Sequence, residues 1–218
     1  MSYSQFRYTV QLNMENRRCV VVGGGDVALR KTKSLLAAGA SVTLIAPTVL
    51  PAIAALQEAC PALTVYRREF HAGDTANAFL VIAATDNRSV NKAVAQEAKA
   101  HNALLNVADD PEAGNFSVAG AYDNGNLHFS AATGGNPRLT HLLLEDLQQQ
   151  YGDDVAEFSA FLDEQRNKIR KILPGARARQ EFWRKTLTIQ LLQEVKAGRL
   201  QQAKETIINA VNCIGTEP

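Results

Sequence analysis

The residues best suited to chemistry are small ones that follow a short apolar run. The sequence from Arg18 to Lys31 reads RCVVVGGGDVALRK. Gly23, Gly25 and Ala28 have the spacing G-x-G-x-x-A, which allows a tight turn, close approach of the main chain to a pyrophosphate and close packing of helix on strand. The first N–H groups of the following helix would face the anion. A glycine-rich turn without a ligand fits the letters equally well, but the order strand, turn and helix favours a dinucleotide site.

A carboxylate follows another apolar run and could act as a base. Leu104 to Val107 leads to Ala108-Asp109-Asp110-Pro111. Ligands of open α/β sheets lie beyond the carboxyl ends of the strands, so Asp109 would stand where a nicotinamide belongs and could accept a proton. From the residues alone, a turn or N-cap aspartate before Pro111 is the simpler interpretation.

The elements that must position these residues alternate between strand and helix. This order over residues 18–110 predicts an α/β fold with a doubly wound parallel sheet. Strands are expected at 19–22, 41–45, 63–66, 79–84 and 104–107, and helices from 26, at 51–59 and at 87–101. The second strand ends in Ile45-Ala46-Pro47-Thr48, without the acid that commonly binds a ribose hydroxyl. NAD and NADP therefore both remain open, and Thr48 or backbone groups must hold the ribose.

The pattern changes after residue 113. Two β-like segments, 116–121 and 127–131, surround a turn, and Thr133-Gly134-Gly135-Asn136-Pro137 opens a helix whose spacing continues until Pro174. Two further helices are expected at 176–196 and 201–212. We predict a dinucleotide-binding domain at 1–113, a small α+β region at 114–150 and a helical domain at 151–218. The middle region is too small for a core of its own, so we expect it to be buried in a homodimer.

Composition excludes several classes of protein. The chain has 218 residues, 46% of them hydrophobic, and a net charge of +1, which gives no overall attraction to nucleic acid or membrane. No stretch approaches the roughly 20 apolar residues that span a bilayer, and no signal-peptide pattern is present, so we expect a cytoplasmic protein. The three cysteines and four histidines are scattered, which predicts no metal site.

Charge is segregated in the last third of the sequence. Residues 145–164 hold seven acids and no Lys or Arg, whereas residues 166–185 hold eight bases and one acid. Two solvated helix faces, or faces that pair across a dimer, explain this pattern as well as an anion site does.

The chain resembles the siroheme synthase dehydrogenase/ferrochelatase family. The matching residues are VVGGGDVALRK at 21–31, VTLIAP at 42–47, AATDN at 83–87, NVADDP at 106–111 and the T-G-G turn at 133–135. The resemblance implies a Rossmann-type domain, a dimerisation region at 114–150 and NAD-dependent oxidation of precorrin-2 to sirohydrochlorin. It also implies that some members insert Fe²⁺, which would be a substrate here. We expect no fused methyltransferase domain.

The resemblance implies roles for particular residues. The family's essential aspartate falls on Asp109, with Asp110 as the weaker candidate. Residues expected to contact the dinucleotide are Gly23, Gly24, Gly25, Asp26, Val27, Ala28, Pro47, Thr48 and Thr85. Residues expected to contact the tetrapyrrole are Thr133, Gly134, Gly135, Asn136 and His141. The turn Gly135-Asn136-Pro137 is one residue shorter than in relatives, which leaves iron insertion open.

Two other functions fit parts of the sequence. A regulatory nucleotide-sensing module needs the glycine turn but not Asp109, Thr133 or the basic segment. A dehydrogenase of another small acid needs the turn and a base but a different substrate wall.

Overall fold

The computed structural model describes residues 8–214, which divide between Val118 and Ala119 into two compact units. The division lies five residues beyond the predicted boundary at 113, because Phe116 packs against the core of the first unit.

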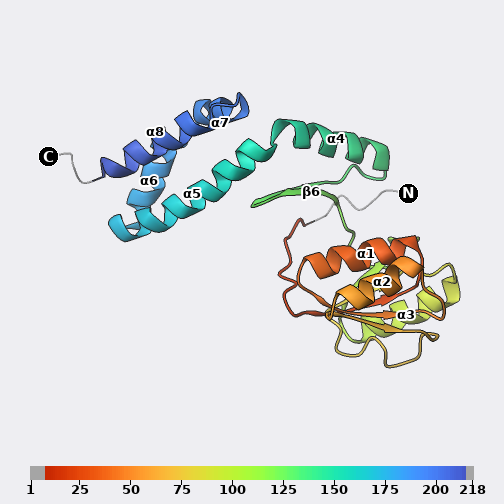
Figure 1. Ribbon diagram of the computed structural model, residues 1–218. Helices are drawn as coiled ribbons and strands as arrows, with labels where there is room; N and C mark the ends of the chain where they lie inside the picture. Colours follow the sequence, from red (N-terminus) through yellow and green to blue (C-terminus); the bar gives the residue numbers. More distant parts are fainter. Residues whose placement is uncertain (1–7, 215–218) are drawn as a thin grey trace. The chain divides into compact units, whose positions relative to one another are not determined.

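The first unit is built on a parallel sheet of five strands in the order β3-β2-β1-β4-β5. Figure 1 shows this sheet together with its helices. Chain order reverses between β1 and β4, and ligands of doubly wound sheets bind at such a switch point. The fold class predicted from the sequence is confirmed. The strands are β1 Arg18–Val22, β2 Ser41–Ile45, β3 Leu63–Tyr66, β4 Leu80–Ala83 and β5 Leu104–Val107, and the helices are α1 Asp26–Ala37, α2 Pro51–Ala59 and α3 Arg88–Ala100.

Helices cover both faces of this sheet, which explains why β4 is apolar throughout and β1 is apolar from Cys19 onward. Alternate residues of β1 enter different cores: Val21 packs with Ala28 of α1 and Ile53 of α2, whereas Val20 packs with Val94 of α3. All four residues of β4 are buried. Continuous apolar runs are typical of parallel strands buried on both sides.

The second unit begins with an antiparallel hairpin of β6 Gly120–Asn124 and β7 Leu127–Ala131, against which helix α4 Pro137–Gln150 packs (Figure 1). A Cβ on Gly120 would lie 2.8 Å from methyl groups of Thr140 and Leu144, so a larger residue would require these side chains to move. The prediction of a strand from 116 was wrong, because Phe116 belongs to the first core and pairing begins only at Gly120.

Four helices complete the second unit around one apolar core that includes Phe158, Ile169 and Ile207. They are α5 Asp153–Ile172, α6 Ala176–Thr186, α7 Ile189–Lys196 and α8 Leu200–Asn212. Two predicted helices are interrupted. The break at Tyr151 places its ring 5.1 Å from that of Phe129, and the break at Leu187 lets the Thr188 hydroxyl cap Leu191 N–H at the start of α7.

Candidate functional site

The backbone of the segments that follow β2 and β4 packs closely against the glycine turn. Gly23 has φ of +133°, and a Cβ there would lie 2.1 Å from the carbonyl oxygen of Ala84, just after β4. A Cβ on Gly24 would lie 2.0 Å from the carbonyl oxygen of Thr48. Both glycines are therefore required by the fold itself, whatever the turn binds.

Gly25 differs, because a Cβ on it would meet no protein atom within 4 Å. Gly25 is the N-cap residue of α1, and no side chain caps the helix. The first-turn N–H groups and the positive end of the helix dipole therefore face open space. The N-terminus of α1 has no side-chain cap, and the protein packing does not require glycine at position 25. Both features fit a bound pyrophosphate, as the sequence predicts.

The segment after β2 forms the neighbouring wall. Leu50 N–H donates to the carbonyl oxygen of Gly24 at 3.0 Å, which fixes Pro47 and Thr48 beside the turn. Both residues are exposed, as are Asp26 and Val27 at the start of α1. Ala28, in contrast, is fully buried against the sheet. The structure thus brings the predicted cofactor residues of three chain segments to one edge of the sheet.

Asp109 lies at the same edge and is joined to the segment after β4. Nδ2 of Asn91 on α3 lies 3.3 Å from Oδ1 of Asp109 and 2.9 Å from the carbonyl oxygen of Thr85. The Asn91 side-chain oxygen accepts from the N–H and hydroxyl of Thr85. Asn91 was missed in the sequence, because one polar residue on a helix resembles any solvent-facing residue.

The two adjacent aspartates have different surroundings. Oδ1 of Asp110 accepts a hydrogen bond from Ala113 N–H at 3.2 Å, within the turn that follows β5. The turn-forming role considered for Asp109 is therefore performed by Asp110. Asp109 is exposed at the sheet edge and bonded to Asn91, an arrangement that leaves it accessible to a substrate.

The predicted substrate residues belong to the second unit. Gly134 and Gly135 have positive φ, and the Asn136 side chain caps α4 by accepting from Leu139 N–H. The hydroxyl of Thr133 lies 2.6 Å from the carbonyl oxygen of Asn136. His141 pairs with Glu145 at 3.1 Å on the exposed surface of α4. These residues form one local group, and their contact with a substrate stays a prediction.

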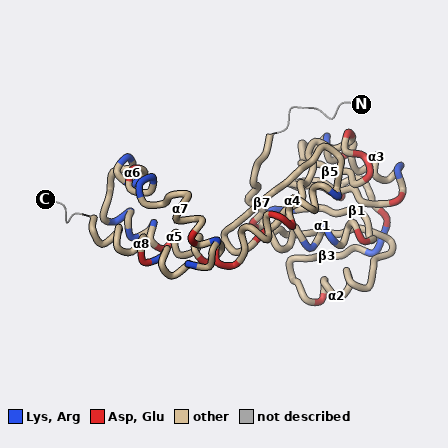
Figure 2. Tube along the Cα trace, turned by 90° about the horizontal axis from the view of Figure 1, so that it is seen from above, with Lys and Arg blue, Asp and Glu red and all other residues tan. Residues whose placement is uncertain are grey.

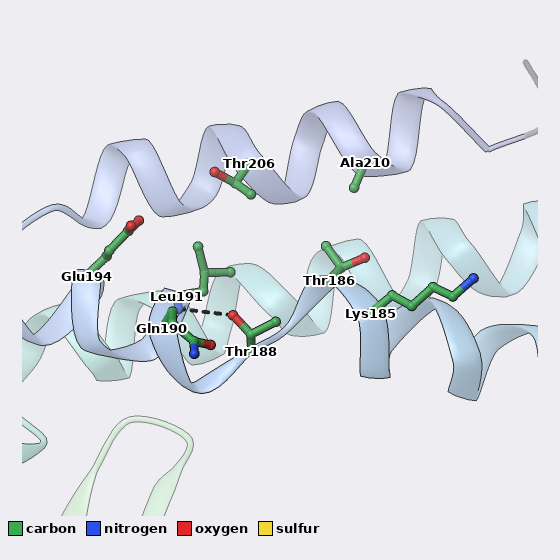
Figure 3. Close-up of a pocket in the computed structure, with 8 residues that line it drawn as sticks. All are labelled: Lys185, Thr186, Thr188, Gln190, Leu191, Glu194, Thr206 and Ala210. Carbon is green, nitrogen blue, oxygen red and sulfur yellow. Dashed lines mark hydrogen bonds between the residues drawn. The ribbon is translucent and has the colours of Figure 1, made fainter.

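The helical unit carries the segregated charge. Lys and Arg, blue in Figure 2, recur on α6, where Arg177, Arg184 and Lys185 border a hollow of about 320 Å³. A second hollow of about 440 Å³ is lined by Thr188, the N-cap residue of α7, by Glu194 of α7 and by Thr206 of α8 (Figure 3). Neither hollow includes a predicted site residue.

Residues 8–214 contain neither a metal-binding cluster nor a membrane-spanning helix. No three His, Cys, Asp or Glu side chains in this range gather closely enough to hold a metal ion. Across the same residues, no helix is both long and apolar enough to cross a membrane.

The sheet order, glycine turn and bare helix start define a dinucleotide-binding protein of the doubly wound class. A family model for NAD(P)-binding domains matches residues 10–120, and a model for the sirohaem synthase dimerisation region matches residues 155–211. The precorrin-2 dehydrogenase of Priestia megaterium is 36% identical over 166 residues, which cover 76% of this chain and 81% of that protein. The chain therefore belongs to the siroheme synthase dehydrogenase family, and the predicted cofactor, NAD, is confirmed.

Other relatives extend beyond this chain. The siroheme synthase of Methylococcus capsulatus is 32% identical over 202 residues, which cover 92% of this chain but 42% of that protein. The chain thus spans about two fifths of the length of such siroheme synthases. A solved structure of SirC, a precorrin-2 dehydrogenase, aligns with a TM-score of 0.76 at 28% identity, covering 93% of this chain and 100% of that one. The dimerisation model matches the segment predicted as the helical domain, and the assignment of 114–150 stays a prediction.

Proposed function

We propose that this chain oxidises precorrin-2 to sirohydrochlorin with NAD⁺ as the oxidant. The observation that carries the proposal is the alignment with the whole length of a solved precorrin-2 dehydrogenase. The site supports the same reaction, because the bare helix start at Gly25 and the carboxylate of Asp109 lie at one edge of the sheet. NAD⁺, when bound, accepts the hydride that the macrocycle loses.

The protein's own residues have three tasks in this proposal. The N–H groups at the start of α1 bind the pyrophosphate, and the exposed segment at Pro47 and Thr48 holds the adjoining ribose. Asp109 accepts the proton released with the hydride. The basic residues of α6 suit a substrate with eight carboxylates, and the turn at Thr133 provides hydroxyl and backbone groups for the macrocycle.

NADH formation tests the proposal directly. Purified protein is mixed with NAD⁺ and precorrin-2, and NADH and sirohydrochlorin are followed by absorbance. Equal amounts of both products are expected. A parallel NAD⁺ titration without substrate separates the alternatives, because a regulatory module would bind NAD⁺ but leave precorrin-2 unchanged. A dehydrogenase of another acid would give NADH only with that acid.

Iron insertion is a second candidate activity, favoured by the matches to siroheme synthases. Fe²⁺ would be a transient substrate, since the described residues offer no cluster of metal ligands. The test is anaerobic incubation with sirohydrochlorin and Fe²⁺, followed by the siroheme absorbance spectrum. Failure of this reaction would leave the dehydrogenase proposal standing.

We also infer that the chain works as a homodimer. The match of residues 155–211 to a dimerisation region supports this inference. In addition, α4 exposes Leu139, Leu142 and Leu143 by 42–46% each, an apolar surface that a second chain could bury. Cytoplasmic location stays a prediction from the sequence.

A further inference from the structure

Asn91 is a buried polar side chain that takes no direct part in the proposed reaction. It lies in the first turns of α3, is 4% exposed and faces the carboxyl ends of β4 and β5. An amide buried to this degree is costly unless its hydrogen bonds are made. The arrangement of those bonds therefore indicates what the amide does.

All four bonding positions of the amide are used. The oxygen accepts from the N–H and hydroxyl of Thr85 at 3.2 and 2.8 Å, and the nitrogen donates to the Thr85 carbonyl oxygen and to Asp109. A backbone N–H can only donate, so the atom facing Thr85 N–H must be the amide oxygen. The nitrogen consequently faces Asp109, and it has no freedom to turn away.

We infer that Asn91 is a positioning residue that holds the carboxylate of Asp109 in the orientation in which it accepts the proton. The inference rests on the proposed function. Asp109 is on the exposed turn after β5, where a free carboxylate would sample several rotamers. The amide is anchored by three bonds to Thr85, so its fourth bond fixes Asp109 relative to the strand end beside the cofactor turn. Misplacing a reacting group by about 1 Å can cost about 10²-fold in rate.

The test uses Asn91→Asp, which keeps the size and the oxygen that accepts from Thr85 but removes the nitrogen that donates to Asp109 and to the Thr85 carbonyl oxygen. We expect kcat for NADH formation to fall by about 10- to 10²-fold, with the Kd for NAD⁺ unchanged. Asn87→Asp is the matched control. It adds the same charge four residues earlier, at the N-cap of α3, where Asp is as good a capping residue as Asn. The control should retain wild-type kcat.

A double variant shows whether Asn91 acts through Asp109. In an Asp109→Asn background, Asn91→Asp should cause no further fall in kcat, because the group it positions is already lost. Multiplicative losses would overturn the inference, as would a weakened Kd for NAD⁺ at unchanged kcat. Either result would assign Asn91 to the framework of the cofactor turn.

A second measurement does not depend on turnover. Three-bond couplings report the χ1 rotamer of Asp109, which should be single in the wild type and averaged in Asn91→Ala. Averaging already in the wild type would overturn the positioning role. Absence of NADH formation by the wild type would instead reject the proposed function, and the couplings would still decide whether Asn91 fixes Asp109.

Discussion

Oε1 of Glu97 on α3 lies 2.6 Å from the hydroxyl oxygen of Thr75, in the loop between β3 and β4. The same carboxylate accepts from the N–H groups of Thr75 and Gly73. Partial burial raises the pKa of Glu97, but these hydrogen bonds and the nearby His101 outweigh that effect, so its pKa lies below the ordinary value. The ionised carboxylate of Glu97 therefore stabilises the packing of the loop between β3 and β4 against α3.

We predict a pH-dependent loss of stability on changing Glu97 to Gln. A lowered folded-state pKa contributes stability above the ordinary glutamate pKa of about 4.3, and the contribution disappears as pH falls through the folded value. At neutral pH, Glu97→Gln should lower the free energy of unfolding by about 1–3 kcal/mol. Denaturant unfolding should show this difference shrinking below about pH 4. Glu58→Gln, an exposed site on α2, is the control and should show little difference at any pH.

Gly25→Asp should abolish NAD⁺ binding while the protein remains folded. The new side chain enters open space, and Asp is a favoured N-cap residue, so the thermal midpoint should not fall. Its carboxylate would repel the pyrophosphate and occupy the N–H groups that bind it. Calorimetric titration with NAD⁺ measures the effect, and unchanged affinity would show that the dinucleotide binds elsewhere.

Gly24→Ala should have a different effect, which makes it a useful comparison. Its Cβ would lie 2.0 Å from the carbonyl oxygen of Thr48, so the backbone must shift. Overpacking of this kind costs about 1–3 kcal/mol, and the thermal midpoint should fall measurably. A variant as stable as the wild type would contradict the close contact between the turn and the segment after β2.

Asp109→Asn should reduce the dehydrogenase rate by about 10²- to 10⁴-fold, the usual contribution of a general base. The amide keeps the size of the side chain but cannot accept the proton, and NAD⁺ affinity should hardly change. Steady-state kinetics and NAD⁺ titration measure the two effects separately. Asp110→Asn should cause a much smaller loss, because Asp110 is bonded within the turn. A greater loss at Asp110 would identify it as the base.

Sedimentation equilibrium at micromolar concentration should give twice the mass of one chain. Replacing Leu139 and Leu142 on α4 with Gln removes apolar surface that is already exposed in one chain. If this surface lies in the dimer interface, the double variant should dissociate while its circular dichroism remains that of a folded protein. A wild-type chain that sediments as a monomer would count against the dimer.

The apolar runs allowed much of the first unit to be predicted. Strands 41–45, 63–66 and 104–107 have the expected bounds. Strand β4 is buried at all four positions, as expected of an apolar run covered on both faces, whereas 63–66 alternates buried and exposed residues, as expected of a half-buried strand. The hairpin was harder to place, since Phe116 reads as a strand residue but packs in the first core.

The interrupted helices and the role of Asn91 could not be predicted for a different reason. The side chain of Thr188 caps α7, so the chain leaves the helical conformation between α6 and α7. The apolar spacing of the sequence continues through this break and therefore predicts one long helix. The role of Asn91 depends on its hydrogen bonds to Thr85 and Asp109. These two residues are far apart in the sequence and come together only at the carboxyl ends of the strands. Neither interaction has a periodic signal.

The segment after β5 limits strand pairing with other chains along β5, the outermost strand on one side of the sheet. The side chain of Asn115 accepts from Leu105 N–H and donates to the carbonyl oxygen of Ala103. The outward carbonyl oxygens of Leu105 and Val107 accept from the backbone N–H groups of Asn115 and Asp110. An exposed strand edge is a template for strand addition and aggregation. At β5 the chain's own continuation already bonds the N–H and carbonyl oxygen of Leu105 and the carbonyl oxygen of Val107, which disfavours addition of another strand there.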